Sequence, residues 1–221
     1  MLDDGFVRLD AHMGDDLSVV NAARVSFGSH ADVLDERNQG LVRFLMRERH
    51  GTPFEHTAFR FHVRCPIFVA REWFRHRVGS FNELSGRYTE LAEAFYVPAA
   101  ADVRTQVGKP GAYTFQPVEP ELAAKTRAAM EAAYASAYAT YRALLDDGVA
   151  KEVARSVLPV GIYTEFFWTV NARSIMHFLS LRNEETAQRE IRMFATAVED
   201  LWGGHMPVTH AAFVANDRTA P

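Results

Sequence analysis

A dense group of charged and hydroxyl-bearing side chains lies in residues 75–88, which read RHRVGSFNELSGRY. Arginine presents a planar fork of N–H donors that matches a phosphate or carboxylate through two hydrogen bonds. Arg75, His76 and Arg77 are consecutive at an expected helix end, so they point in different directions and could surround an anion. Glu83 could accept a hydrogen bond from an N–H of the same ligand. The segment therefore predicts an anion-binding site.

Two other interpretations of this segment stay open. Local ion pairing could explain part of the charge, although it would leave several arginines without an acidic partner nearby. Ser80 or Ser85 could be a nucleophile with His76 as its base, but a serine nucleophile needs a base that a third group orients. We expect both hydroxyls to bind a ligand or to cap the local turn.

A second group of basic residues lies in NARSIMHFLSLRN, residues 171–183. On a helix, Phe178 and Leu179 belong to an apolar stripe, and Arg182 falls on that stripe. A buried guanidinium needs a partner. Arg173 and His177 form an i,i+4 pair on an adjacent face, and Arg155 precedes an expected helix end. These residues predict a second basic cluster that meets the first around anionic groups.

Arginine greatly outnumbers lysine, because the chain has 21 arginines and 3 lysines. High genomic GC content could produce this bias. Composition does not explain position, since six of the arginines fall within residues 60–87. The net charge of −4 does not indicate nucleic-acid binding by the molecule as a whole.

Familiar cofactor and metal motifs are absent from the sequence, including G-x-G-x-x-G after a strand, the P-loop and H-E-x-x-H. A nucleotide would have to be held by side chains rather than by a glycine-rich turn. Cys65 could be a nucleophile, but it shares the apolar face of an expected strand, where a thiol behaves as a small hydrophobe. We expect Cys65 to belong to the core and no metal to be bound.

The elements that would position these residues follow from periodicity. Alternation predicts a half-buried strand at 57–65 and β-branched and aromatic residues predict another at 160–170, with a further strand at 93–98. Thr52 and Glu55 predict a capping box, while 107–120 is expected to be a surface loop. Helices are expected at 15–27, 38–49, 66–77, 120–147, 150–158, 171–183 and 186–202. This order predicts an α+β fold with a small sheet, in one domain.

The N-terminal residues MLDDGFVRLD are acidic where a signal peptide would be basic and then apolar, and no apolar run approaches the length of a membrane span. One cysteine cannot form an intrachain disulfide, which agrees with a reducing compartment. We expect a cytoplasmic protein.

The motif R-H-R, seven residues, then S, here Arg75 to Ser85, resembles the signature of the flavin-dependent thymidylate synthases. The resemblance continues through HGTPFEH, EVARSVLP and FFWTVNARSIMHFLSLR. It implies one domain over residues 1–221 with a small, mostly antiparallel sheet flanked by helices. It also implies reductive methylation of dUMP to dTMP, with 5,10-methylenetetrahydrofolate as carbon donor and NADPH-reduced FAD as hydride source. Homotetramers with shared active sites are implied, and neither a nucleic acid nor a membrane is an expected partner.

The resemblance also implies roles for individual residues. Arg182 would bind the uracil and promote ionisation at N3, and His50 matches a histidine near the flavin. Glu72 stands where glutamine is familiar in the family, and His177 where asparagine occurs in some members. The implied dUMP contacts are Glu72, Arg75, Glu83, Ser85, Arg87, Arg155 and Arg182. The implied FAD contacts are Ser26, Thr52, Arg75, His76, Arg77, Glu83, Asn171, Arg173 and His177.

Two rival classes of function remain. Clustered arginines and aromatic residues are also typical of an RNA- or nucleotide-binding module, which would show steep salt dependence and no flavin affinity. A non-catalytic family member is the third possibility, for which Glu72 is the only indication.

Overall fold

The computed structural model describes residues 2–221, and its centre is a four-stranded antiparallel sheet with the order β1-β2-β6-β3. These strands are β1 (Phe6–Met13), β2 (Ala58–Pro66), β6 (Tyr163–Val170) and β3 (Ser80–Glu83). A separate two-stranded hairpin consists of β4 (Arg104–Val107) and β5 (Thr114–Pro117). The α+β class and the antiparallel sheet predicted from the sequence are confirmed.

Alternation of side chains gives the sheet one apolar face and one polar face. Phe59, Phe61 and Val63 of β2 are fully buried, whereas Arg60 between them is exposed. Phe61 is opposite Trp168 in the register between β2 and β6, and their rings lie 5.7 Å apart. This pairing places the large aromatic side chains of both central strands in one core.

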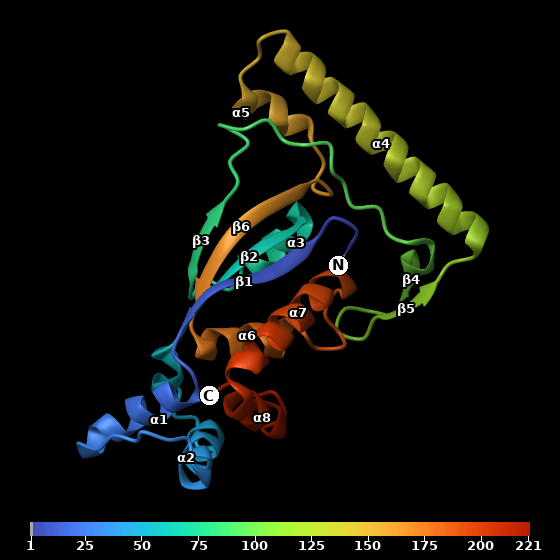
Figure 1. Cartoon of the computed structure of the whole chain (residues 1–221). Coiled ribbons are helices and arrows are strands. Elements are labelled where there is room, and N and C mark those ends of the chain that lie inside the picture. The colour runs from blue at the N-terminus through green and yellow to red at the C-terminus, as the bar shows by residue number, and fades with distance from the viewer. Residues whose placement is uncertain (1) are drawn as a thin grey trace.

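Helices α3, α6 and α7 pack against the sheet, and Figure 1 shows α1 and α2 at the opposite end of the molecule from α4. Helix α6 begins where β6 ends, because Asn171 accepts a hydrogen bond from the backbone N–H of Ser174 and so caps the first turn. The bounds are α1 (Asp16–Arg24), α2 (Glu36–Arg47), α3 (Ile67–Trp73), α4 (Pro120–Asp146), α5 (Lys151–Ala154), α6 (Ala172–Arg182), α7 (Arg189–His205) and α8 (Pro207–Ala215).

Short 3-10 helices connect several of these elements. They are η1 (Val25–Phe27), η2 (Thr52–Glu55), η3 (Ala100–Asp102) and η4 (Arg155–Val157). None of the helices within residues 2–221 has the length and hydropathy that crossing a membrane requires.

Two buried carboxylates join helix α7 to distant parts of the chain. Glu190 accepts hydrogen bonds from Arg104 of the β4-β5 hairpin at 2.8 Å and from the Tyr96 hydroxyl at 3.2 Å. Glu199 accepts hydrogen bonds from Asn183, His210 and Arg218. The bonds from His210 and Arg218 fix α8 and the segment after it. Burial opposes ionisation of Glu199, but these three hydrogen bonds outweigh burial and lower its pKa.

The sequence predicted most of these elements but missed the less regular ones. The predicted strand at 93–98 is wrong, because only Phe95 forms an isolated bridge, to Ile162. The expected surface loop at 107–120 contributes part of the β4-β5 hairpin. Strands β1 and β3 and helix α8 were not predicted. Strand β1 carries a register shift between Leu9 and Ala11, which interrupts the alternation on which sequence reasoning depends.

Candidate active site

Arg182 is the centre of the first group of predicted site residues. Its Nη1 donates to Glu72 Oε2 at 3.1 Å, its Nη2 to the Glu72 backbone oxygen at 3.2 Å, and its Nε to His76 Nε2 at 3.1 Å. The Arg182 and Glu72 side chains are only 22% and 26% exposed. The sequence predicted that a buried guanidinium at Arg182 needs a partner. Glu72 in α3 and His76 just after that helix are these partners.

The surroundings of Arg182 change the ionisation of its two neighbours. Burial, then the charge of Arg182, then His177 lower the pKa of His76 to about 4. His76 is consequently neutral near pH 7, and its Nε2 accepts the Arg182 N–H. Burial raises the pKa of Glu72, although Arg182 opposes that rise and Glu190 adds to it.

A cavity of about 560 Å³ lies beside this group, lined by Arg71, Glu72, Arg75 and Arg182. Arg71 lies in α3 and Arg75 directly after its C-cap residue, and both are exposed. Neither forms an ion pair with an acidic side chain anywhere in residues 2–221, in contrast to Arg182. The cavity therefore offers two guanidinium groups that are available to an anion.

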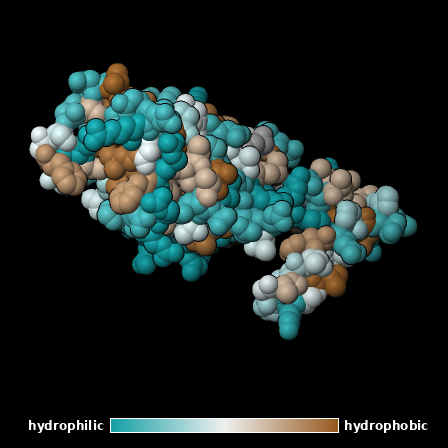
Figure 2. Space-filling model, turned by 90° about the horizontal axis from the view of Figure 1, so that it is seen from below, coloured by the Kyte–Doolittle hydropathy of each residue, from teal (hydrophilic) through white to brown (hydrophobic). Residues whose placement is uncertain are grey.

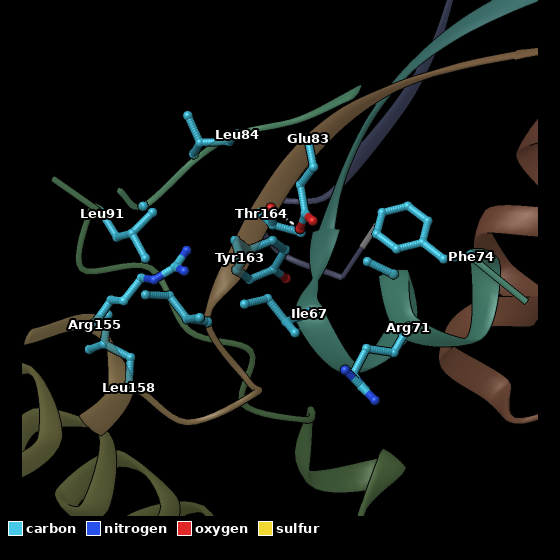
Figure 3. A pocket seen from close by; sticks show the side chains of 13 residues that line it. Ile67, Arg71, Phe74, Glu83, Leu84, Leu91, Arg155, Leu158, Tyr163 and Thr164 are labelled. Atoms are coloured by element: carbon cyan, nitrogen blue, oxygen red, sulfur yellow. Dashed lines mark hydrogen bonds between the residues drawn. The ribbon is translucent and has the colours of Figure 1, made fainter. Parts of the chain in front are cut away.

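A second cavity, of about 250 Å³, lies where β3 and β6 approach η4. In Figure 3 the Glu83 carboxylate points toward Thr164, while Arg155 extends toward the cavity from the other side. The backbone of Gly86 lies against Arg155, because an added Cβ at Gly86 would be 3.1 Å from Arg155 Cδ. Arg155 has no acidic partner in the described part of the chain, so this cavity also suits an anion.

A third group surrounds the N-terminus of α6. Arg173 Nη1 donates to Glu55 Oε1 at 2.5 Å, and Arg173 Nε donates to the Pro221 oxygen at 2.8 Å. Gly51 leaves room for this side chain, since a Cβ at that position would lie 2.5 Å from Arg173 Nε and would force the arginine to shift. Burial, followed by the charge of Arg173, lowers the pKa of His177.

The predicted capping box at Thr52 and Glu55 is wrong. Gly51, rather than Thr52, is the N-cap residue of η2, and no side chain caps this short helix. Glu55 instead binds Arg173 from across the fold. A tertiary ion pair thus replaces the local hydrogen bond that the sequence pattern indicated.

The remaining predicted residues lie apart from these groups or at their edges, and of those described next Ser85 is half-buried while the others are exposed. Ser26 is in η1, beyond the end of α1. Arg77 follows α3 and has no acidic partner within residues 2–221. The Ser85 hydroxyl accepts from the backbone N–H of Arg87 at 3.3 Å, as expected for a turn cap. Arg87 Nε pairs with Glu152 of α5 at 2.8 Å.

Sequence reasoning missed three residues that touch the predicted site. Thr164 donates to Glu83, Glu55 holds Arg173 and Glu152 holds Arg87. Each partner is more than 60 residues away in the chain, so no local spacing could have found it. An isolated threonine in an otherwise apolar, inward-facing row of β6 was the one signal available.

Cys65 is fully buried on the apolar face of β2, and burial, followed by the charge of Glu83, raises its pKa. The core interpretation of this cysteine is confirmed. The described residues contain no group of three or more His, Cys, Asp or Glu side chains arranged to bind a metal ion. The geometry as a whole defines an α+β protein with two arginine-lined cavities that suit an anion.

Comparisons with known proteins agree with that class. Residues 8–208 match the family described as "Thymidylate synthase complementing protein". The "Flavin-dependent thymidylate synthase" of Streptomyces coelicolor is 49% identical over 219 residues, which cover 93% of this chain and 89% of that protein. The protein of the same description from Pseudothermotoga lettingae is 47% identical, covering 97% of this chain and 92% of its own.

A solved structure is also similar throughout. The UMP/dUMP methylase PolB from Streptomyces cacaoi, bound with 5-Br UMP, superposes with a TM-score of 0.91 and 44% identity. The superposition covers 99% of this chain and 97% of that one. The chain belongs to the thymidylate synthase complementing protein family, and the predicted family and fold are confirmed.

Proposed function

We propose that this protein is a flavin-dependent thymidylate synthase that methylates dUMP to dTMP. A methylene group from 5,10-methylenetetrahydrofolate and a hydride that originates on NADPH together form the methyl group. Tetrahydrofolate and NADP⁺ are then the other products. Family membership over residues 8–208 supports this activity. The structural observation that carries it is the set of unpaired guanidinium groups around the two cavities, which suit a phosphorylated substrate.

The residues present fit a bound FAD. The resemblance implies that side chains hold the flavin, and here Arg75 and Arg77 lack acidic partners within the described chain, so they can pair with its phosphates. Gly51 lets Arg173 approach the backbone of η2, and Thr52 lies in the same turn. We propose the full implied set of Ser26, Thr52, Arg75, His76, Arg77, Glu83, Asn171, Arg173 and His177 for this cofactor. FAD would supply hydride transfer, while the protein supplies orientation and electrostatics.

The dUMP-binding residues divide by charge. Arg155, Arg87 and Arg75, with the Ser85 hydroxyl, suit the phosphate, whereas a carboxylate such as Glu83 suits a hydroxyl or N–H donor. Arg182 would face the uracil, where a fixed guanidinium stabilises negative charge that develops at N3 or O2. Its contacts with Glu72 and His76 hold that guanidinium in one orientation.

We further propose that residues 1–221 form one domain and that four copies assemble with shared active sites. One apolar core contains residues from Leu2 to Phe213, which supports a single domain. Large apolar side chains beside site residues are exposed in the single chain, with Phe27 at 86%, Tyr88 at 76% and Val78 at 71%. Figure 2 shows apolar patches scattered over an otherwise hydrophilic surface on the side of α1, α2 and α8. A partner subunit would cover such residues.

Purified protein tests the proposal directly. We expect a yellow preparation that contains FAD, oxidises NADPH and forms dTMP from dUMP and methylenetetrahydrofolate. Colourless protein that neither binds added FAD nor forms dTMP would refute the proposed function. Salt-sensitive RNA binding without flavin affinity would instead favour the rival binding module.

UMP is a second candidate substrate. Its support is the similarity to PolB, which is described as a UMP/dUMP methylase. Competing UMP against dUMP in one reaction measures the ratio of their kcat/KM values. Comparable values would establish a methylase for both nucleotides, whereas no product from UMP would restrict the protein to dUMP.

A further inference from the structure

The Thr164 hydroxyl is a polar group on the apolar side of the sheet. Thr164 is 4% exposed, and it shares the inward-facing row of β6 with Phe166 and Trp168. A hydroxyl in such a place costs free energy unless it is hydrogen-bonded. Among residues 2–221 its one hydrogen bond runs from Oγ1 to Glu83 Oε1, at 2.7 Å.

Strand β3 brings Glu83 to this hydroxyl. Phe81 and Glu83 are two residues apart, so they face the same side of the sheet. Phe81 packs against Phe166 and Trp168, and Glu83 is opposite Phe166 in the register. Glu83 therefore follows Phe81 on the same face of β3, and its carboxylate contacts Thr164 at the edge of the cavity (Figure 3).

Only one of the two Glu83 oxygens is used in this contact. Oε2 has no hydrogen-bond donor within the described chain, and the cavity that Glu83 lines is otherwise mainly apolar apart from Arg71 and Arg155. The hydrogen bond from the buried Thr164 restricts how the exposed Glu83 carboxylate can turn, and it leaves the second oxygen free. That oxygen can accept from a ligand while the arginines bind the ligand's anionic group.

We propose that Thr164 is a positioning residue, which orients Glu83 so that Oε2 accepts a hydrogen bond from a hydroxyl or N–H of the bound nucleotide. The inference rests on the proposed function for the identity of that nucleotide. Thr164 itself makes no contact with the reacting atoms. Its contribution passes entirely through the Glu83 carboxylate.

Four single variants and one double variant separate this role from a packing role. Thr164→Val removes the donor with little change in shape, and Thr164→Ser keeps the hydroxyl. Thr169→Val is the matched control, because Thr169 lies in β6 but belongs to the other, outward-facing row. Glu83→Gln, alone and with Thr164→Val, completes a double-mutant cycle. The measurements are the dUMP dissociation constant of the FAD-loaded protein by calorimetry, kcat/KM for dUMP, and Tm.

Because the Thr164 hydroxyl donates to a charged carboxylate, we expect Thr164→Val to weaken dUMP binding and lower kcat/KM about tenfold or more. Thr164→Ser and Thr169→Val should stay within about threefold of wild type, and Thr164→Val should have little further effect in the Glu83→Gln background. Unchanged binding in Thr164→Val would overturn the inference. So would equal losses in Thr164→Ser, in Thr169→Val, or in the Glu83→Gln background.

The two proposals fail in different ways. Wild-type protein that binds dUMP but forms no dTMP would refute the proposed function, and the calorimetric series would still decide the role of Thr164. Wild-type protein that binds no dUMP would overturn both.

Discussion

Replacing Arg182 with alanine removes a guanidinium group that lines the first cavity. Three hydrogen bonds are lost, two to Glu72 and one to His76, and the Glu72 carboxylate loses its cation. The pair is about one quarter exposed, so the stability cost should lie near the lower end for charged hydrogen bonds, about 1.5–2 kcal/mol. For a chain of this size that corresponds to a fall in Tm of roughly 5 °C.

The effect of Arg182→Ala on catalysis should be much larger than its effect on stability. Removing one preorganised donor to a developing anion typically lowers kcat by about 10²–10³. FAD binding should persist, because only His76 of the nine proposed FAD contacts is hydrogen-bonded to Arg182, and Arg173 lies nine residues earlier on α6, about 13 Å along the helix axis. The assays are dTMP formation, flavin absorbance of the purified protein and thermal unfolding.

Two control variants complete the experiment on Arg182. Arg142→Ala removes an exposed arginine of α4 that pairs with Glu90 and Asp146, and it should change neither activity nor flavin content. Glu72→Gln keeps an acceptor for Arg182 and should retain most of the activity. Unchanged turnover in Arg182→Ala would refute the role of Arg182, and loss of FAD in the same variant would refute the separation of the two groups along α6.

Three further predictions concern ionisable groups away from Arg182. Arg104→Ala should lower the free energy of unfolding by about 3 kcal/mol in urea titrations, because it leaves the buried Glu190 carboxylate without its cation, and an unchanged midpoint would contradict this. Cys65 should resist a thiol reagent in the native protein and react after denaturation, and Cys65→Ser should keep its activity; labelling of the folded protein would contradict the core assignment. Folding lowers the pKa of Glu199, so its carboxylate stabilises the native protein at pH values above its pKa in the unfolded state. That stabilisation is lost as the pH falls through the lower pKa of the folded state. Glu199→Gln should therefore reduce the fall in Tm that wild-type protein shows at acidic pH.

The sequence was sufficient for features that depend on local periodicity. The strands at Ala58–Pro66 and Tyr163–Val170 followed from alternation and β-branched content, and the long helix at Pro120–Asp146 followed from its alanine-rich repeat. The burial of Cys65 followed from the same alternation. Irregular elements escaped, because the bulge in β1 and the four-residue length of β3 leave too few repeats for a pattern.

The sequence by itself determined which residues are suited to bind an anion, since the arginine clusters at 75–87 and 173–182 can be read directly from it. The motif within the first cluster also specified the family. Only the tertiary structure decided their partners. Arg182 meets Glu72, Arg173 meets Glu55, and Glu83 meets Thr164 across separations of 81–118 residues. These pairings depend on strand register and helix packing, which arise from contacts between distant segments and leave no spacing rule in the sequence.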